Sequence, residues 1–170
     1  MITLQELNEC DLDRFVGVCG PLFEQSPWIA RRTFDRRPFA SLGVLHRELC
    51  RTMRGATRDE QVRLIASHPD LVGRLAREGR LTRESTGEQA AAGLAQLSDD
   101  EVAVFERLNA EYRAKFGFPF VVCARENQKE AILAAFPLRL SHSREQEIAT
   151  ALGEIEKIAR LRLLDAVRED

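Results

Sequence analysis

His68 is the residue best suited to acid–base chemistry in this sequence, and it stands directly before Pro69. An imidazole titrates at about pH 6.5, so it can give or take a proton near neutral pH. Because the residue before a proline avoids the helical conformation, we expect the apolar helix through Leu64 and Ile65 to stop at His68. A histidine that binds the last carbonyl groups of a helix would show the same pattern, since that end of a helix is negative. Both interpretations stay open on local grounds.

A second polar cluster runs from Thr82 to Gln89. Within it, Ser85 and Glu88 have the spacing of a capping box, which would give both a purely structural role. The same spacing places a carboxylate and an amide at a helix start, where backbone N–H groups converge on anions. Glu88 and Gln89 together offer a polar edge suited to urea-like groups. The cluster is therefore a candidate ligand site as well as a candidate cap.

Two arginines, Arg160 and Arg162, lie among leucines near the end of the sequence. An arginine on a largely apolar stretch either pairs with an anion or extends its charged end into solvent. The sequence leaves both outcomes open. The other two histidines are His46, among polar neighbours in a helical stretch, and His142, beside two serines in a loop. Surface roles suffice for both.

Helices are predicted to position these residues, because capping boxes recur along the chain. Each pairs a Ser, Thr or Asn with a Glu or Gln three residues later, and apolar residues then follow with a helical period. Shorter helices are predicted at residues 12–19, 28–34 and 41–53. The predicted caps are Thr3 with Glu6, Thr57 with Glu60, Ser98 with Glu101, Asn127 with Glu130, and Ser143 with Gln146.

One apolar stretch, residues 118–123, does not follow the helical pattern. A lone buried strand is one interpretation, but we expect an extended core segment because no partner strand is visible. Pro137 is expected to kink or restart its helix. The predicted fold class is all-α: a single compact multi-helix domain of about eight helices over residues 1–170, with one short extended segment.

The charge balance argues against several classes of partner. With 25 basic and 27 acidic residues, the chain has a net charge of −2 and no global positive field for nucleic acid. The basic run Arg31, Arg32, Arg36 and Arg37 is the best candidate for a local positive patch, but we favour the interpretation that it is a solvated helix face. No apolar run approaches the ~20 residues of a membrane span, and the N-terminus has no secretory signal.

The four cysteines predict a reducing environment and no metal site. Their spacing contains no CxxC pair and fits no zinc pattern. Free, buried thiols are expected, and a cytoplasmic location follows from that expectation.

Four motifs in order resemble one family. They are SHPDLVGRLA at 67–76, LTRESTGEQAAAGL at 81–94, LNAEYRAKFGFPFVVCAR at 108–125 and EIEKIARLRL at 154–163, with RRPF at 36–39 as a further element. Together they resemble the 2-oxo-4-hydroxy-4-carboxy-5-ureidoimidazoline (OHCU) decarboxylases over essentially the whole chain. The resemblance implies an all-helical carboxy-lyase, commonly a homodimer, that uses no metal or organic cofactor. It also implies conversion of the small molecule OHCU to (S)-allantoin in urate degradation.

The resemblance also implies which residues form the site. The family's HP histidine falls on His68, the carboxylate of its S-x-x-E-Q motif on Glu88, and its late-helix arginine on Arg162. These three are the expected catalytic residues. The positions expected to shape or contact the substrate are Pro69, Ser85, Gln89, Phe120, Val121, Val122, Cys123 and Ala124.

Other function classes remain as alternatives. The tripeptide His68-Pro69-Asp70 also occurs in J-domain co-chaperones, which are helical interaction modules, but there it follows a strongly basic helix. Here the preceding segment mixes both signs of charge. A helical scaffold without catalysis would leave the three candidate residues unexplained, and a metal hydrolase lacks its ligand spacing. A decarboxylase of another ureide acid is the nearest alternative.

Overall fold

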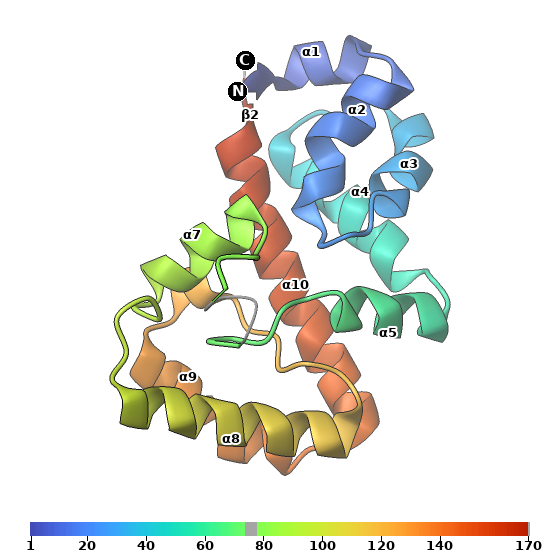
Figure 1. The fold of residues 1–170 in the computed structure, drawn as a ribbon. Helices are drawn as coiled ribbons and strands as arrows, with labels where there is room; N and C mark the ends of the chain where they lie inside the picture. The colour runs from blue at the N-terminus through green and yellow to red at the C-terminus, as the bar shows by residue number, and fades with distance from the viewer. Residues whose placement is uncertain (74–77, 170) are drawn as a thin grey trace. The chain divides into compact units, whose positions relative to one another are not determined.

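The computed structural model describes residues 1–73 and 78–169 (Figure 1). In that part of the chain nine α-helices and one two-stranded sheet are present, which confirms the all-α fold class. The chain divides into two compact units, and each is described here by itself. Unit 1 comprises Met1–Ser67 with Glu156–Asp170, and unit 2 comprises His68–Ile155. The assignment of residues 1–170 to one domain stays a prediction. The end of the first family motif, residues 74–76, lies outside the described residues.

Unit 1 is built mainly from short helices. Leu12–Cys19, Trp28–Thr33 and Leu42–Arg54 confirm the three helices predicted in the N-terminal third, and α3 packs on both α2 and α4. The unit contains α1 (Leu4–Glu9), α2 (Leu12–Cys19), α3 (Trp28–Thr33), α4 (Leu42–Arg54), α5 (Arg58–Ala66) and the end of α10 (Arg144–Ala166), with 3-10 turns at Gly20–Leu22 and Phe34–Arg36.

A small sheet in unit 1 was not predicted. Strand β1 (Ile2–Thr3) pairs in parallel with β2 (Val167–Arg168), so the two ends of the chain meet. Two residues per strand are too few to show an alternating pattern, and therefore the sequence carried no signal for it.

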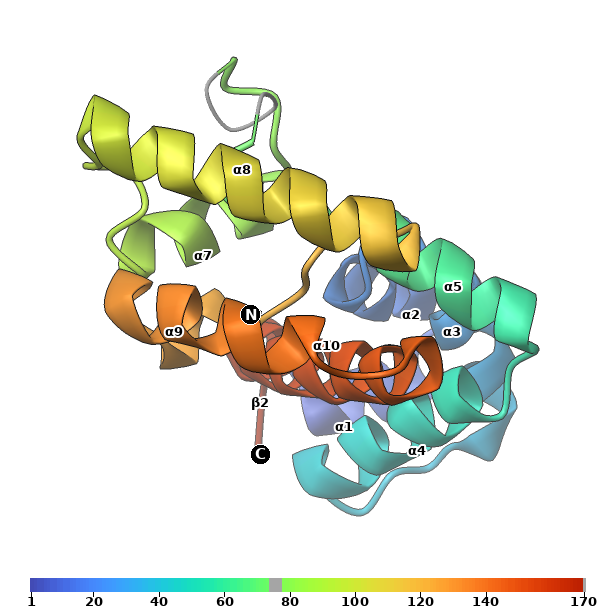
Figure 2. The same cartoon turned by 90° about the horizontal axis from the view of Figure 1, so that it is seen from below.

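Unit 2 contains the longer helices and the extended segment. Helix α8 packs against α9 (Figure 2). Helix α7 contacts the 3-10 turn at Ala124–Glu126. The helices are α7 (Arg83–Ala91), α8 (Asp99–Phe116), α9 (Lys129–Leu140) and the first part of α10. The contact with α7 brings the C-terminal end of the extended segment beside the helix that carries Ser85, Glu88 and Gln89.

Local capping explains where most of these helices start. The hydroxyl of each cap accepts from the backbone N–H three residues on, while the later side chain accepts from the cap's own N–H. This reciprocal pattern confirms four predicted boxes: Thr3 with Glu6, Thr57 with Glu60, Ser98 with Glu101, and Ser143 with Gln146.

Two predicted helix starts were wrong. Asn127 does not cap α9, because its amide donates to the Cys123 carbonyl at 3.0 Å and the helix begins two residues later at Lys129. Ser85 does not start α7, because the Thr82 hydroxyl accepts from the Ser85 N–H at 3.2 Å and the helix begins at Arg83. Ser85 is therefore a buried residue within the first turn.

An aromatic cluster explains why residues 118–123 are not helical. Gly117 has a φ of +80° and ends α8 in the left-handed conformation, which glycine adopts without strain. The chain then runs extended through the core, where the Phe120 ring stacks on Phe136 at 3.9 Å. The buried rings of the cluster are Phe105, Tyr112, Phe116, Phe118, Phe120 and Phe136.

Of the two outcomes expected at Pro137, a restart of the helix is wrong, while a kink stays a prediction. Helix α9 continues through Pro137 as one element from Lys129 to Leu140. Proline lacks an N–H donor and so removes one hydrogen bond of the helix. Because Pro137 lies near the C-terminal end of α9, only the last turn follows that missing bond.

Candidate functional site

His68 lies immediately beyond the end of α5, as its position before Pro69 predicted. The helix ends at Ala66, and Ser67 is its C-terminal cap. The Ser67 hydroxyl lies 2.6 Å from the Leu64 carbonyl oxygen and can close the last turn. His68 itself is only 7% exposed. A buried imidazole next to a capped helix end has a fixed backbone, which suits a residue that must present a proton in one direction.

The backbone after His68 is held by the side chain of Gln89 from α7. The Gln89 Oε1 atom accepts from the Val72 N–H at 3.1 Å, and its Nε2 atom donates to the Asp70 carbonyl at 3.5 Å. Val72 has a φ of +55°, which is uncommon for a β-branched residue. The hydrogen bond to Gln89 therefore holds a strained turn in place.

Helix α8 holds the same segment from another direction. Asn109 donates from Nδ2 to the Leu71 carbonyl at 2.7 Å, and Arg113 donates to the Asp70 carboxylate at 2.9 Å. Asn109 is 8% exposed, and its Oδ1 atom has no hydrogen-bond partner among residues 1–73 and 78–169. These contacts border a hollow of about 260 Å³ lined by Asp70, Gly73, Glu106, Asn109, Ala110 and Arg113. Sequence reasoning did not identify Asn109 or Arg113.

Glu88 and Gln89 point in different directions from α7. Gln89 is buried with Ser85, one turn earlier, whereas Glu88 is partly exposed. Burial, with smaller contributions from the negative charges of Glu126, Glu154 and Glu88, raises the pKa of the Cys123 thiol to about 11. Glu88 is thus within electrostatic range of Cys123.

The extended segment is fixed by a buried arginine. Arg139 donates from Nη1 to the Val121 carbonyl at 2.6 Å, and its guanidinium lies 4.1 Å from the centre of the Phe120 ring. At the far end of the segment, the Cys123 N–H donates to Glu154 at 2.8 Å. The backbone of residues 121–123 is therefore held at two points by charged side chains.

Glu147 neutralises the buried Arg139. Its carboxylate is fully buried and accepts from Arg139 Nε at 2.9 Å, from the Tyr112 hydroxyl, and from His142 Nδ1 at 2.7 Å. Burial and the bond to Glu147 raise the pKa of Tyr112, so its hydroxyl stays a donor. His142, predicted to have a surface role, is instead half-buried and bound to this network.

Arg162 lies in unit 1, where it pairs with a carboxylate and does not extend into solvent. Its Nη1 and Nη2 atoms each lie 3.2 Å from Glu24 Oε2, and Nη1 also donates to the Pro21 carbonyl at 3.1 Å. Both residues of the pair are buried, while Arg160 is exposed. Sequence reasoning missed Glu24, although a lone acid following the apolar pair Leu22 and Phe23 is a signal for a buried partner.

The basic run in unit 1 is only partly a solvated face. Arg32 pairs with Glu60 at 2.6 Å and Arg36 with Glu48 at 3.0 Å. Arg37 is half-buried and donates to the carbonyls of Phe34, Asn8 and Cys10. These bonds connect elements of unit 1, so the run has a structural role.

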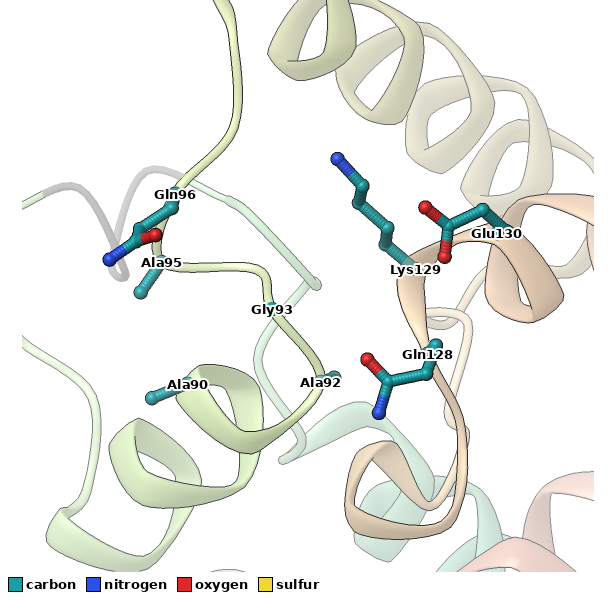
Figure 3. Close-up of a pocket in the computed structure, with 8 residues that line it drawn as sticks. All are labelled: Ala90, Ala92, Gly93, Ala95, Gln96, Gln128, Lys129 and Glu130. Atoms are coloured by element: carbon teal, nitrogen blue, oxygen red, sulfur yellow. The ribbon is translucent and has the colours of Figure 1, made fainter.

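A larger hollow lies away from the predicted residues. It has a volume of about 490 Å³ and lies between the end of α7 and the start of α9 (Figure 3). Its charged side chains, Lys129 and Glu130, have opposite signs, and Lys129 pairs with Glu101 at 2.5 Å. The lining residues are Ala90, Ala92, Gly93, Ala95, Gln96, Gln128, Lys129 and Glu130.

The described part of the chain shows neither a cluster of metal-binding residues nor a helix that could cross a membrane. No group of three or more His, Cys, Asp or Glu residues suited to a metal ion occurs in residues 1–73 and 78–169. Over the same residues, no helix combines the length and apolar character that crossing a bilayer requires.

Unit 2 thus brings together several of the predicted positions. The segment that begins with His68 and Pro69 is tied to Gln89, while α7 contacts the turn that follows Cys123. Arg162 belongs to unit 1.

Comparisons with known proteins agree with the motifs. The model of the OHCU decarboxylase family matches residues 8–164. An OHCU decarboxylase from Haloferax volcanii is 42% identical over 164 residues, which cover 96% of this chain and 95% of that protein. One from Halalkalicoccus jeotgali is 40% identical over 162 residues, or 95% and 90% of the two chains. A crystal structure of (S)-allantoin synthase superposes with a TM-score of 0.78 at 25% identity; the match covers 99% of this chain and 54% of that one. This chain therefore belongs to the OHCU decarboxylase family.

Proposed function

We propose that this chain converts OHCU to (S)-allantoin with release of carbon dioxide. One structural observation carries the proposal: the side chain of Gln89 binds the backbone of residues 70–72, which ties the EQ motif of α7 to the His68–Pro69 turn. Two motifs of the family thereby meet through contacts between residues 17 and 19 positions apart in the chain. Family membership supplies the reaction, since the relatives named above are OHCU decarboxylases.

The proposed substrate contains its own electron sink. The carbon that loses carbon dioxide also carries a hydroxyl group and adjoins a C=N bond that bears the ureido group. When the carbon–carboxylate bond breaks, its electron pair forms a C=C bond and the C=N electrons move to nitrogen, which takes a proton. The hydroxyl then loses its proton to become a carbonyl, and the ureido-bearing carbon is protonated. One proton is consumed overall, and no external oxidant or reductant is needed.

We assign the proton transfers to His68 and Glu88. His68 acts as the general acid–base group at the substrate hydroxyl, because it is buried at a fixed turn and an imidazole exchanges protons near neutral pH. Glu88, partly exposed on α7, orients His68 or the ureido N–H groups and relays the proton. Protonation from one face gives a single enantiomer.

We assign substrate binding to Arg162 and to residues around the turn. Arg162 binds ring or ureido oxygens, where its planar fork gives directional hydrogen bonds. Pro69, Ser85, Gln89 and residues 120–124 shape the site. The fixed carbonyl of Val121 and the fixed N–H of Cys123 support such a role for the extended segment.

The remaining proposals concern the context of the reaction. Because the substrate supplies its own electron sink, we propose that the reaction needs no metal or organic cofactor. We also propose a cytoplasmic location, because the cysteines are free and a reducing compartment keeps them so. Burial raises the pKa of Cys19 and Cys50 to about 12, so both stay protonated at neutral pH. The family resemblance supports a homodimer.

The test generates OHCU in the cuvette from urate by oxidation and hydrolysis. Circular dichroism of the product then follows the addition of this protein. With the protein we expect a rapid signal of one sign, because protonation from one face gives a single enantiomer. Without the protein we expect no signal, because spontaneous decay yields a racemate. His68→Ala should lower turnover by about 10²–10⁴-fold. A rate and signal equal to those of the control without enzyme would refute the proposed function, while full activity of His68→Ala would refute only its assignment.

A further inference from the structure

We propose that Glu24 is a positioning residue for Arg162. Glu24 holds the guanidinium of Arg162 in one orientation and balances the positive charge of that guanidinium during decarboxylation. The inference rests on the proposed function, because it concerns how tightly Arg162 binds an anionic substrate. It requires only contacts inside unit 1.

The contacts fix the orientation of the guanidinium. Both terminal nitrogens of Arg162 lie 3.2 Å from one oxygen of Glu24, and Nη1 also reaches the Pro21 carbonyl at 3.1 Å. An arginine fork bound by a carboxylate and a carbonyl cannot rotate freely about its stem. Glu24 therefore determines which way the arginine faces.

The burial of the pair makes the charge balance effective. The side chain of Arg162 is 5% exposed and that of Glu24 is 3% exposed. Charges interact more strongly away from water, so a carboxylate at this distance offsets part of the positive charge of the arginine. What remains for a substrate is a set of directed N–H donors with a reduced positive charge.

Glu24 also contacts the residue before the predicted catalytic histidine. Its carbonyl oxygen lies 2.8 Å from the hydroxyl of Ser67, and Ser67 directly precedes His68 in the chain. The side chain of Glu24 thus acts on Arg162, while its backbone holds the end of α5.

The chemistry explains why a balanced arginine is useful. The substrate carboxylate leaves as neutral carbon dioxide, so its negative charge is lost in the transition state. An unbalanced arginine would bind this carboxylate more tightly in the ground state than in the transition state and would slow the reaction. By offsetting that charge, Glu24 allows Arg162 to orient the substrate without stabilising the group that must leave.

The decisive variant is Glu24→Gln, which removes the charge but keeps the size of the side chain and an oxygen acceptor. The matched control is Glu48→Gln, which removes a partly exposed carboxylate of unit 1 that pairs with Arg36 at 3.0 Å. For both full-length variants, calorimetry measures the binding of two probes. Allantoate carries a carboxylate and two ureido groups, whereas allantoin carries a ureido group without net charge.

We expect Glu24→Gln to bind allantoate about tenfold more tightly than the unmodified protein, with allantoin affinity changed by less than about twofold. Its kcat and its KM should both fall, since the ground state gains more than the transition state. Glu48→Gln should match the unmodified protein in every quantity. Allantoate affinity that is unchanged or weaker in folded Glu24→Gln would overturn the inference, because a purely structural role weakens both probes.

A second background identifies the route of the effect. In Arg162→Gln, adding Glu24→Gln should not tighten allantoate binding further, and tightening that persists there would overturn the role of Arg162. If Glu24→Gln does not fold, Glu24→Asp carries the test, because it moves the carboxylate away from Arg162. Compared with the unmodified protein, Glu24→Asp should bind allantoate more tightly and allantoin with the same affinity. A change of the same size in both affinities would overturn the inference. If the unmodified protein does not turn over OHCU, the proposed function is refuted. The two failures can be told apart, because the binding measurements do not require turnover.

Discussion

Replacing Arg139 by methionine should destabilise the protein far more than losing a surface ion pair. Arg139 is 5% exposed and Glu147 is fully buried, with 2.9 Å and 2.8 Å between the guanidinium nitrogens and Glu147 Oε2. Methionine fills part of the volume but leaves the buried carboxylate without its cation. Breaking a buried pair from one side destabilises a protein by about 3–5 kcal/mol. The carbonyl of Val121 also loses its donor.

Urea unfolding followed by circular dichroism measures the loss in free energy, and thermal unfolding followed in the same way measures the melting temperature. At about 2–4 °C per kcal/mol for a chain of this length, the melting temperature should fall by about 6–20 °C. The matched control is Arg107→Met, which removes an exposed pair with Glu111 at 3.9 Å and should change stability by less than about 0.5 kcal/mol. Equal losses for Arg139→Met and Arg107→Met would refute the reasoning.

The double variant Arg139→Met with Glu147→Gln separates the buried charge from the lost packing. The amide of the glutamine can still accept from the Tyr112 hydroxyl, but it brings no uncompensated charge into the core. The double variant should therefore be more stable than Arg139→Met alone. A double variant that is less stable would show that the arginine acts through packing on Phe120.

Two further predictions concern acid stability and the His68 turn. Hydrogen bonds from Arg32 and then Thr57 hold the pKa of Glu60 at about 2, below its ordinary value of 4.5. Its stabilising contribution is complete above about pH 4.5 and is lost as the pH falls toward 2, so Glu60→Gln should flatten that part of an acid-unfolding curve followed by circular dichroism. Asn109→Ala leaves the buried Leu71 carbonyl without its donor, which should destabilise the protein by about 1–3 kcal/mol and speed hydrogen exchange in residues 70–72. An unchanged acid curve, or unchanged exchange, would contradict the respective prediction.

The parts of the fold that could be predicted depend on interactions within one helical turn. Thr57 and Glu60 satisfy each other's backbone groups three residues apart, so the start of α5 is visible in the sequence. The start of α7 was misplaced because two hydroxyls, on Thr82 and Ser85, compete for the cap, and burial of Ser85 decides between them. Such competition is settled by packing, which local spacing does not report.

The site contacts that were missed join residues far apart in the chain. Glu24 and Arg162 are separated by 138 residues, and Asn109 and Leu71 by 38 residues. A single sequence shows that a buried arginine needs an anion, but not which of 27 acidic residues supplies it. The residue types could be predicted, whereas the partners could not.

The neighbouring residues Glu88 and Gln89 show how one helix can supply two different functions. Successive side chains on a helix diverge by about 100°, so they cannot both face the same group. Gln89 is buried and holds the backbone after His68, whereas Glu88 is partly exposed and lies within electrostatic range of Cys123. Any shift of α7 would therefore move the candidate acid and the turn that presents the candidate histidine together. This coupling is a physical reason for the two residue types to stand side by side, and it does not require Gln89 to touch the substrate.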